Sequence, residues 1–188
     1  MAPAAVGYAF FTTALGECAL AWTGDAIAAV QLPESSHAAG LRRLLRRHPG
    51  LAPAAAVPPH ADRAMARIAA LFEGSADDLC SIALDMTGVP EFHQRVYRIA
   101  RAIPPGRTLS YGDVARQLGD LGAARAVGRA LGHNPFAPVV PCHRVLAAGS
   151  RSGGFSAAGG VATKLRMLQI EGARFGVEPG LFDGAPAD

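Results

Sequence analysis

The break Gly88-Val89-Pro90 separates two parts of this chain that carry different hydrophobic patterns, and this division limits the folds open to it. Before the break, Gly16 and Gly24-Asp25 punctuate short apolar runs within residues 7–32, which is typical of strands joined by tight turns. After the break, apolar residues recur at helical spacing. We therefore predict an α+β protein with a small N-terminal α/β unit and a helical C-terminal unit.

The N-terminal unit, residues 1–87, is expected to combine strands and helices. We expect strands at 8–13, 17–22, 26–32 and 81–85, and helices at 35–48 and 61–72. The first of these helices carries four arginines, at positions 42, 43, 46 and 47. We interpret them as the solvated face of a surface helix, with a DNA-binding patch as the alternative.

The C-terminal unit, residues 88–172, is expected to be mainly helical. Ser110 is a typical N-cap for a helix that runs to about residue 118, and a glycine-containing turn then leads to a helix over 123–131. Two short helices joined in this way suggest a helix-turn-helix. Its second helix would place Arg125 and Arg129 on the outer face.

Two more helices are expected in this unit, at 91–103 and 160–170. In the second, the spacing of Val161, Leu165 and Leu168 predicts that these side chains face the core. Residues 173–188 are rich in glycine, proline and acidic residues, and we expect a flexible tail there.

Positive charge is concentrated in the C-terminal unit. The whole chain has a formal net charge of +3, yet residues 88–172 hold eleven lysine and arginine residues against four acidic ones. A basic segment between slightly acidic ones suggests a footprint for a polyanion such as nucleic acid. Ordinary solvation of a surface is the alternative.

The motif Pro141-Cys142-His143-Arg144-Val145 places a cysteine beside a histidine within an apolar run. A cysteine attacks as its thiolate, which a neighbouring histidine makes accessible near neutral pH. A lone cysteine is more often a core residue, so the motif alone leaves both interpretations open. The three cysteines, at positions 18, 80 and 142, have no metal-ligand spacing and suit a reducing cytoplasm. We expect no membrane segment.

Five features then follow one another between about residues 88 and 172. They are Thr108-Leu-Ser-Tyr111, Ala123-Ala-Arg-Ala-Val-Gly128, Asn134-Pro135, the Pro-Cys-His-Arg-Val motif, and Lys164 seven residues before Glu171. In this order and with these gaps, they resemble the O6-alkylguanine-DNA alkyltransferases, or methylated-DNA–protein-cysteine methyltransferases. The resemblance implies a ribonuclease H-like N-terminal domain and a C-terminal domain with a helix-turn-helix.

The resemblance also implies an activity. The chain would repair DNA by irreversible transfer of the alkyl group from O6-alkylguanine, and from O4-alkylthymine, to Cys142. Its partner would be double-stranded DNA that carries alkylated bases. The resemblance further implies a monomer in the cytoplasm that needs neither a metal nor an organic cofactor.

Roles in the chemistry follow from the same resemblance. Cys142 would be the nucleophile and alkyl acceptor. His143 would pass the thiol proton through a water toward Glu171, since neighbours in an extended segment point to opposite faces. Tyr111 would donate to the guanine ring, and Asn134 would hold the turn that carries the cysteine.

For DNA binding, the resemblance implies that Arg125 fills the space left by an extruded base. The expected DNA-binding residues are Ala124, Arg125, Ala126, Gly128 and Arg129. The expected substrate pocket comprises Val145, Ser156 and Lys164. The loop at 153–160 is longer than in many relatives, and Pro138 stands one residue later than the family pattern, so both bear on the shape of the pocket.

Other functions fit parts of the sequence. An alkyltransferase-like lesion sensor would bind alkylated DNA without reacting, but that group lacks the cysteine present here at position 142. A helix-turn-helix transcription regulator would bind a DNA sequence and ignore alkylation. A cysteine hydrolase fits least, because its catalytic dyad seldom uses adjacent residues.

Overall fold

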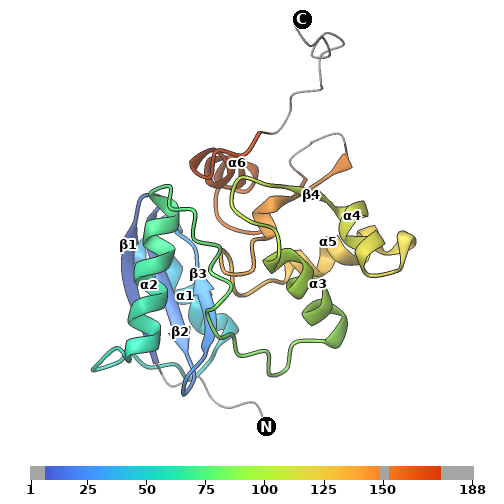
Figure 1. Ribbon diagram of the computed structural model, residues 1–188. Coiled ribbons are helices and arrows are strands. Elements are labelled where there is room, and N and C mark those ends of the chain that lie inside the picture. The colour runs from blue at the N-terminus through green and yellow to red at the C-terminus, as the bar shows by residue number, and fades with distance from the viewer. Residues whose placement is uncertain (1–6, 149–152, 175–188) are drawn as a thin grey trace, which may run out of the picture.

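The computed structural model describes residues 7–148 and 153–174 of the 188-residue chain (Figure 1). The elements of the N-terminal part are β1 (Gly7–Thr13), β2 (Gly16–Trp22), β3 (Ile27–Gln31), α1 (His37–Arg47) and α2 (Pro59–Phe72). Those of the C-terminal part are α3 (Glu91–Arg101), β4 (Leu109–Ser110), α4 (Tyr111–Gln117), α5 (Ala124–Gly132), β5 (Val145–Leu146) and α6 (Val161–Ile170). The predicted mixture of a strand-containing part and a helical part is confirmed. Of the predicted tail, residues 175–188 lie outside the described part.

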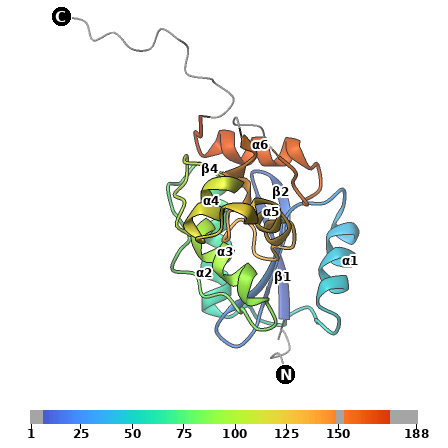
Figure 2. The same ribbon diagram turned by 90° about the vertical axis from the view of Figure 1, so that its right-hand side faces the viewer.

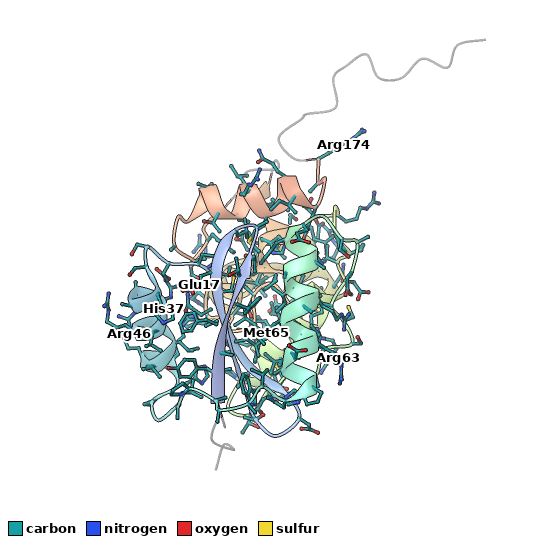
Figure 3. All side chains as sticks on the ribbon, turned by 90° about the vertical axis from the view of Figure 1, so that its left-hand side faces the viewer. Glu17, His37, Arg46, Arg63, Met65 and Arg174 are labelled. Atoms are coloured by element: carbon teal, nitrogen blue, oxygen red, sulfur yellow. The ribbon has the colours of Figure 1, made fainter. Side chains whose placement is uncertain are left out.

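Strands β1, β2 and β3 form an antiparallel sheet in chain order. Gly16 makes the turn between β1 and β2 with a φ of +124°, a conformation that residues with a Cβ rarely adopt. Helix α2 packs on β1 and β2, and α1 packs on β2 and β3. The two helices lie on opposite faces of the sheet (Figure 3).

Alternation along β2 lets this strand serve both faces. Leu20 and Trp22 belong to the large cluster of buried residues that includes α2, whereas Ala19 and Ala21 pack with Leu44 of α1. Successive side chains of a strand point to opposite faces, so both sets are buried. The sheet is therefore a central layer that is packed on both faces, and α1 packs against one of them.

Helix α1 turns most of its arginines to solvent. Arg42, Arg46 and Arg47 are exposed, and Arg46 points away from the sheet in Figure 3. Arg43 is different, because it is half-buried and its Nη1 lies 2.8 Å from Glu34 Oε1. The prediction of a solvated arginine face is thus right for three of the four arginines.

The strand predicted at 81–85 is wrong. Only Leu84 makes a β-bridge, with Ile27. The segment leaves one turn at Leu79, whose φ is +58°, and enters another at Asp85, whose carboxylate accepts a backbone hydrogen bond. Between these two turns, Leu84 alone of residues 81–85 pairs with β3.

A capping box begins α4, and a short strand pair places this start of the helix beside the cysteine motif. Ser110 and Asp113 form a capping box: Ser110 Oγ accepts from Asp113 N at 3.0 Å, and Asp113 Oδ2 accepts from Ser110 N at 2.9 Å. Strand β4 then pairs in parallel with β5, with Leu109 opposite Val145. The first residue of α4, Tyr111, is thereby fixed near Cys142.

Helices α4 and α5 pack against each other and against α3, on the face turned toward the viewer in Figure 2. A 3₁₀ turn, Leu121–Ala123, joins them. In α5, Val127 and Leu131 are buried, whereas Arg125 and Arg129 are exposed. The predicted outward position of both arginines is confirmed.

The predicted inward face of α6 is confirmed at Leu168 but not at Val161 or Leu165. Val161 is exposed and Leu165 is half-buried, whereas Lys164, Met167 and Leu168 are buried. The buried side of α6 therefore includes a polar residue, Lys164, whose ammonium donates to the Val145 carbonyl at 2.7 Å. Helix α6, like every helix of the described segments, is too short or too polar to cross a membrane.

A single cluster of buried apolar residues connects the two parts. It runs from Leu20 in the sheet through Tyr97 of α3 to Met167 of α6. Between the parts, Val30 N of β3 also donates to the Pro135 carbonyl at 2.8 Å. The sheet is therefore tied directly to the turn that precedes the cysteine.

Candidate active site

Cys142 begins a 3₁₀ turn, Cys142–Arg144, that leads directly into β5. Its side chain is buried, at 7% exposure, yet it lines a cavity of about 720 Å³. Tyr111 of α4, Arg125 of α5 and Ser156 line the same cavity. The structure thus brings four of the predicted residues together from four separate segments.

Asn134 fixes the turn ahead of the cysteine. Its Nδ2 donates to the Val140 carbonyl at 2.8 Å, and its Oδ1 accepts from Phe136 N at 2.9 Å. Cys142 N then donates to the same Val140 carbonyl at 2.8 Å. Both polar ends of the buried Asn134 amide are used, so the backbone that carries Cys142 is rigid.

Behind the cysteine, one carboxylate receives three hydrogen bonds. His143 Nε2 lies 2.8 Å from Glu171 Oε1. Arg144 donates from Nη2 to the same oxygen at 2.8 Å and from Nε to Oε2 at 2.9 Å. Its Nη1 donates to the Ile103 carbonyl at 2.6 Å. Such a two-pronged arginine contact holds Glu171 in one orientation.

Burial and these contacts set the charges of the site. Burial raises the pKa of the Cys142 thiol and outweighs the lowering effects of Asn134 and Lys164. Burial also lowers the pKa of His143, in spite of Glu171. For Glu171, burial alone would raise the pKa, but hydrogen bonds from His143 and Arg144 lower it to about 2. The resting site therefore holds a neutral thiol, a neutral imidazole and an ionised carboxylate.

The ionised carboxylate determines which nitrogen of His143 carries the proton. Glu171 can only accept, so the neutral imidazole donates from Nε2 and leaves Nδ1 unprotonated. Nδ1 is buried and has no hydrogen-bond partner within the described segments. A buried acceptor next in sequence to a neutral thiol is suited to take up the thiol proton.

Lys164 is buried between the cysteine and the tyrosine. Its ammonium donates to the Val145 carbonyl and lies 5.8 Å from the centre of the Tyr111 ring. Burial lowers its pKa to about 8, an effect that the neighbouring Cys142 partly offsets. Val145 and Lys164 are both fully buried and neither lines the cavity, so of the three predicted pocket residues only Ser156 does.

Tyr111 lines the cavity, and the backbone at Gly153 lies close to its ring. Burial, followed by the proximity of Cys142, raises its pKa, so the phenol keeps its proton near neutral pH. Gly153 approaches it closely: a Cβ at that position would lie 2.9 Å from Tyr111 Oη. Gly153 also has a φ of +65°, so glycine is required there for two reasons.

The predicted DNA-binding residues divide into two groups. Ala124, Arg125 and Gly128 line the cavity, whereas Ala126 is half-buried and Arg129 is exposed outside the cavity wall. Arg125 alone of the two arginines combines an exposed side chain with a place at the cavity mouth.

Three contributors were not predicted from the sequence. Arg144 was part of the motif but had no assigned partner, Gly153 was read only as part of a loop, and Arg43 was assigned to a solvated face. Glu171, the partner of Arg144, lies 27 residues further along the chain. No acidic residue close to Arg144 in the sequence therefore indicates this contact. Within the described residues, no group of three or more His, Cys, Asp and Glu side chains is placed to hold a metal ion.

Residues 91–173 match the family model described as "6-O-methylguanine DNA methyltransferase, DNA binding domain". A methylated-DNA–protein-cysteine methyltransferase from Mycobacterium tuberculosis is 42% identical over 120 residues, which cover 64% of this chain and 70% of that protein. The chain belongs to the methylated-DNA–protein-cysteine methyltransferase family. Residues 91–173, which match the family model, include the cysteine motif and the five positions predicted to be catalytic.

Further members and neighbours of the family agree with the fold. A crystal structure of Mycobacterium tuberculosis OGT in complex with DNA superposes with a TM-score of 0.69 and 33% identity, covering 89% of this chain and 93% of the other. A protein of Thermus thermophilus named as a DNA base-flipping protein is 41% identical over 139 residues, covering 71% of this chain and 88% of that protein. This chain is thus similar both to proteins named for methyl transfer and to a protein named for base flipping.

Proposed function

We propose that this chain repairs DNA by moving the alkyl group of O6-alkylguanine, and of O4-alkylthymine, to the sulfur of Cys142. The observation that carries this proposal is the position of Cys142 in the wall of a cavity of about 720 Å³, with His143 and Glu171 hydrogen-bonded behind it. The M. tuberculosis relative is named for methyl transfer between methylated DNA and a protein cysteine, which supports the proposal. DNA is accordingly the macromolecular substrate.

The proton and the alkyl group move in opposite directions. The Cys142 thiol passes its proton, through a bridging water, to Nδ1 of His143, and the imidazolium formed is stabilised by Glu171. The thiolate attacks the alkyl carbon, a carbon–sulfur bond forms, and the bond from that carbon to guanine O6 breaks. The electron pair stays with the guanine, whose ring takes a proton from the Tyr111 hydroxyl. The imidazolium gives up its proton and Tyr111 regains one through solvent, so one proton in total moves from the thiol to the guanine.

The product is a thioether on Cys142 and an unmodified guanine. No group in the proposed mechanism hydrolyses a carbon–sulfur bond of this kind, so each molecule accepts one alkyl group. The reaction as written balances without a metal, an oxidant or an organic cofactor. It needs a free thiol, which suits the reducing cytoplasm as its location.

For DNA binding, α4 and α5 would act as a helix-turn-helix, with α5 in the minor groove. Arg125 lines the cavity and is exposed on α5, which supports the proposal that it fills the space of an extruded base. The small side chains Ala126 and Gly128 leave room for the groove wall, and Arg129 would contact a phosphate. Residues 88–172 would form this reactive domain, supported by a ribonuclease H-like domain at residues 1–87.

The Thermus relative makes a non-reacting base-flipping protein the second candidate. Cys142, its neutral histidine neighbour and the anchored Glu171 favour transfer, because binding alone needs no buried proton acceptor. Replacing Cys142 by Ala would then convert this chain into a binder that cannot react.

Intact mass measurement tests the proposal. After incubation with duplex DNA containing O6-methylguanine, the protein is expected to gain the mass of one methylene group, located in the peptide that contains Cys142. Cys80→Ala is the matched control, since Cys80 is an exposed cysteine that does not line the cavity, and its loss should leave the gain unchanged. A wild-type mass that stays constant would contradict the proposed transfer.

A further inference from the structure

We infer that Arg43, on helix α1 of the N-terminal part, is a positioning residue for the transfer proposed above. It holds the loop 153–160, here called the post-cysteine loop, against the cavity. This role rests on the proposed function, because it concerns the same cavity, and the experiment below separates the two.

The Arg43 guanidinium joins two segments that lie 113 residues apart. Its Nη1 donates to Glu34 Oε1 at 2.8 Å, and its Nη2 donates to the Ser156 backbone carbonyl. The two bonds use different nitrogens of one planar group, so fixing one bond also aims the other. A lysine at this position has a single ammonium and no such fixed fork.

The support for Arg43 extends back to the sheet. Glu34 is held by Gln31 Nε2, which lies 3.3 Å from Glu34 Oε1 and 2.8 Å from the Leu32 carbonyl. Gln31 is itself buried at the end of β3. The anchor of the loop is therefore the rigid central layer of the N-terminal part rather than a mobile surface side chain.

The loop needs such an anchor because little else fixes its first half. Among the hydrogen bonds of the described residues, the Arg43–Ser156 bond alone ties residues 153–157 to the N-terminal part. The other backbone bonds of the loop, such as Gly160 N to the Ala157 carbonyl at 3.0 Å, stay within the loop and the start of α6. Phe155 and Ala157 add apolar contacts to the core.

The anchored residue is itself part of the cavity. Ser156 and Phe155 line the cavity, and both also border a narrow cleft that contains Arg43, Asn134 and Cys142. A shift of Ser156 would therefore change the space in which the alkylated base meets the sulfur. Because transfer depends on an in-line approach, displacement of this wall reduces the rate even when DNA still binds.

The test measures the single-turnover transfer rate at saturating duplex DNA, the dissociation constant for the same DNA, and the melting temperature. Arg43→Leu is expected to lower the saturated rate roughly 10- to 100-fold while DNA affinity and melting stay close to wild type. Arg43→Lys should restore only part of the rate. Arg42→Leu is the matched control, because Arg42 is exposed on the same helix and has no hydrogen-bond partner in the described segments.

A double-mutant cycle with Glu34→Gln makes the test independent of any folding defect in one variant. If Glu34 acts by aiming Arg43, Glu34→Gln should lower the rate alone and add little to Arg43→Leu. The inference is overturned if Arg43→Leu reacts like Arg42→Leu, or if it loses DNA affinity and keeps its saturated rate. A wild-type protein that gains no mass would instead defeat the proposed function itself.

Discussion

His143 and Glu171 lie 2.8 Å apart, between Nε2 and Oε1, with side chains that are 0% and 2% exposed. This contact gives the histidine a definite tautomer, and Arg144 shares the same carboxylate. The three side chains form a buried charge unit. Glu171 is its only negatively charged residue, so the unit depends on this carboxylate.

Glu171→Gln should destabilise the fold by about 3–5 kcal/mol, because it leaves the buried Arg144 cation without its counter-charge. It should also slow alkyl transfer, since the imidazolium of His143 loses its stabilising partner. Chemical denaturation and single-turnover rates measure the two effects. Glu73→Gln, at an exposed position, is the control and should be neutral in both. A neutral result for Glu171→Gln would contradict the buried charge unit.

The pH dependence of stability provides a second test of the same group. The pKa of Glu171 is lowered from 4.5 to about 2 in the folded protein. A lowered carboxyl pKa stabilises the fold above the unfolded value, and this contribution is lost as pH falls from 4.5 toward 2. The loss should amount to about 3 kcal/mol. Urea titrations across this range should show a smaller decline in Glu171→Gln than in the wild type, and equal declines would argue against the shift.

Gly153→Ala should impair transfer through steric conflict with Tyr111. The new methyl group would lie 2.9 Å from the Tyr111 hydroxyl, at a backbone φ of +65°. We expect a rate loss of about tenfold from displacement of the loop. Gly24→Ala is the control, since Gly24 does not line the cavity and nothing lies within 4 Å of a Cβ there.

The tyrosine offers an independent check on this conflict. Tyr111→Phe removes the hydroxyl that the Gly153→Ala methyl group would meet. If the clash is the cause, adding Gly153→Ala to Tyr111→Phe should cost less than adding it to the wild type. Equal costs in both backgrounds would show that backbone strain at Gly153 accounts for the loss.

Lys164→Met should make Cys142 a weaker nucleophile. The Lys164 ammonium lowers the pKa of the thiol, so its removal raises that pKa further and reduces the thiolate fraction. The Val145 carbonyl also loses its buried donor, at a cost of about 1–3 kcal/mol. Transfer rates measured against pH should shift to higher pH in the variant. Arg166→Met, an exposed change on the same helix, should leave the profile in place.

Arg125→Ala should weaken repair of duplex DNA roughly tenfold or more, because extrusion of a stacked base costs a few kcal/mol and the arginine would fill the vacancy. Reaction with free O6-benzylguanine should change little. Arg129→Ala, exposed on the same helix, should instead weaken duplex binding and make it less sensitive to salt. Equal losses of Arg125→Ala on both substrates would indicate a role in the fold.

Local sequence signals accounted for the parts of the structure that depend on neighbours in the chain. Turns at Gly16 and Gly24-Asp25 separated the three strands, and Ser110 marked the start of α4 through its capping box. The grouping of the site followed from family resemblance, because no local pattern places Tyr111 beside Cys142.

The sequence was least informative where contacts between residues far apart in the chain determine the local structure. The segment 81–85 has strand character, yet only one of its residues reaches β3. Val161 fits a helical stripe, yet it is exposed, whereas the polar Lys164 is buried. Arg43 resembles its solvated neighbours because its second partner, Ser156, is 113 residues away.

The uninterrupted core from Leu20 to Met167 bears on how such a protein can change. The two parts cannot be exchanged independently. A sheet from another protein would have to make the same core contacts with Tyr97, and its helix would have to make the same contact that Arg43 of α1 makes with Ser156. Substitutions in the first half are therefore constrained by chemistry that takes place in the second.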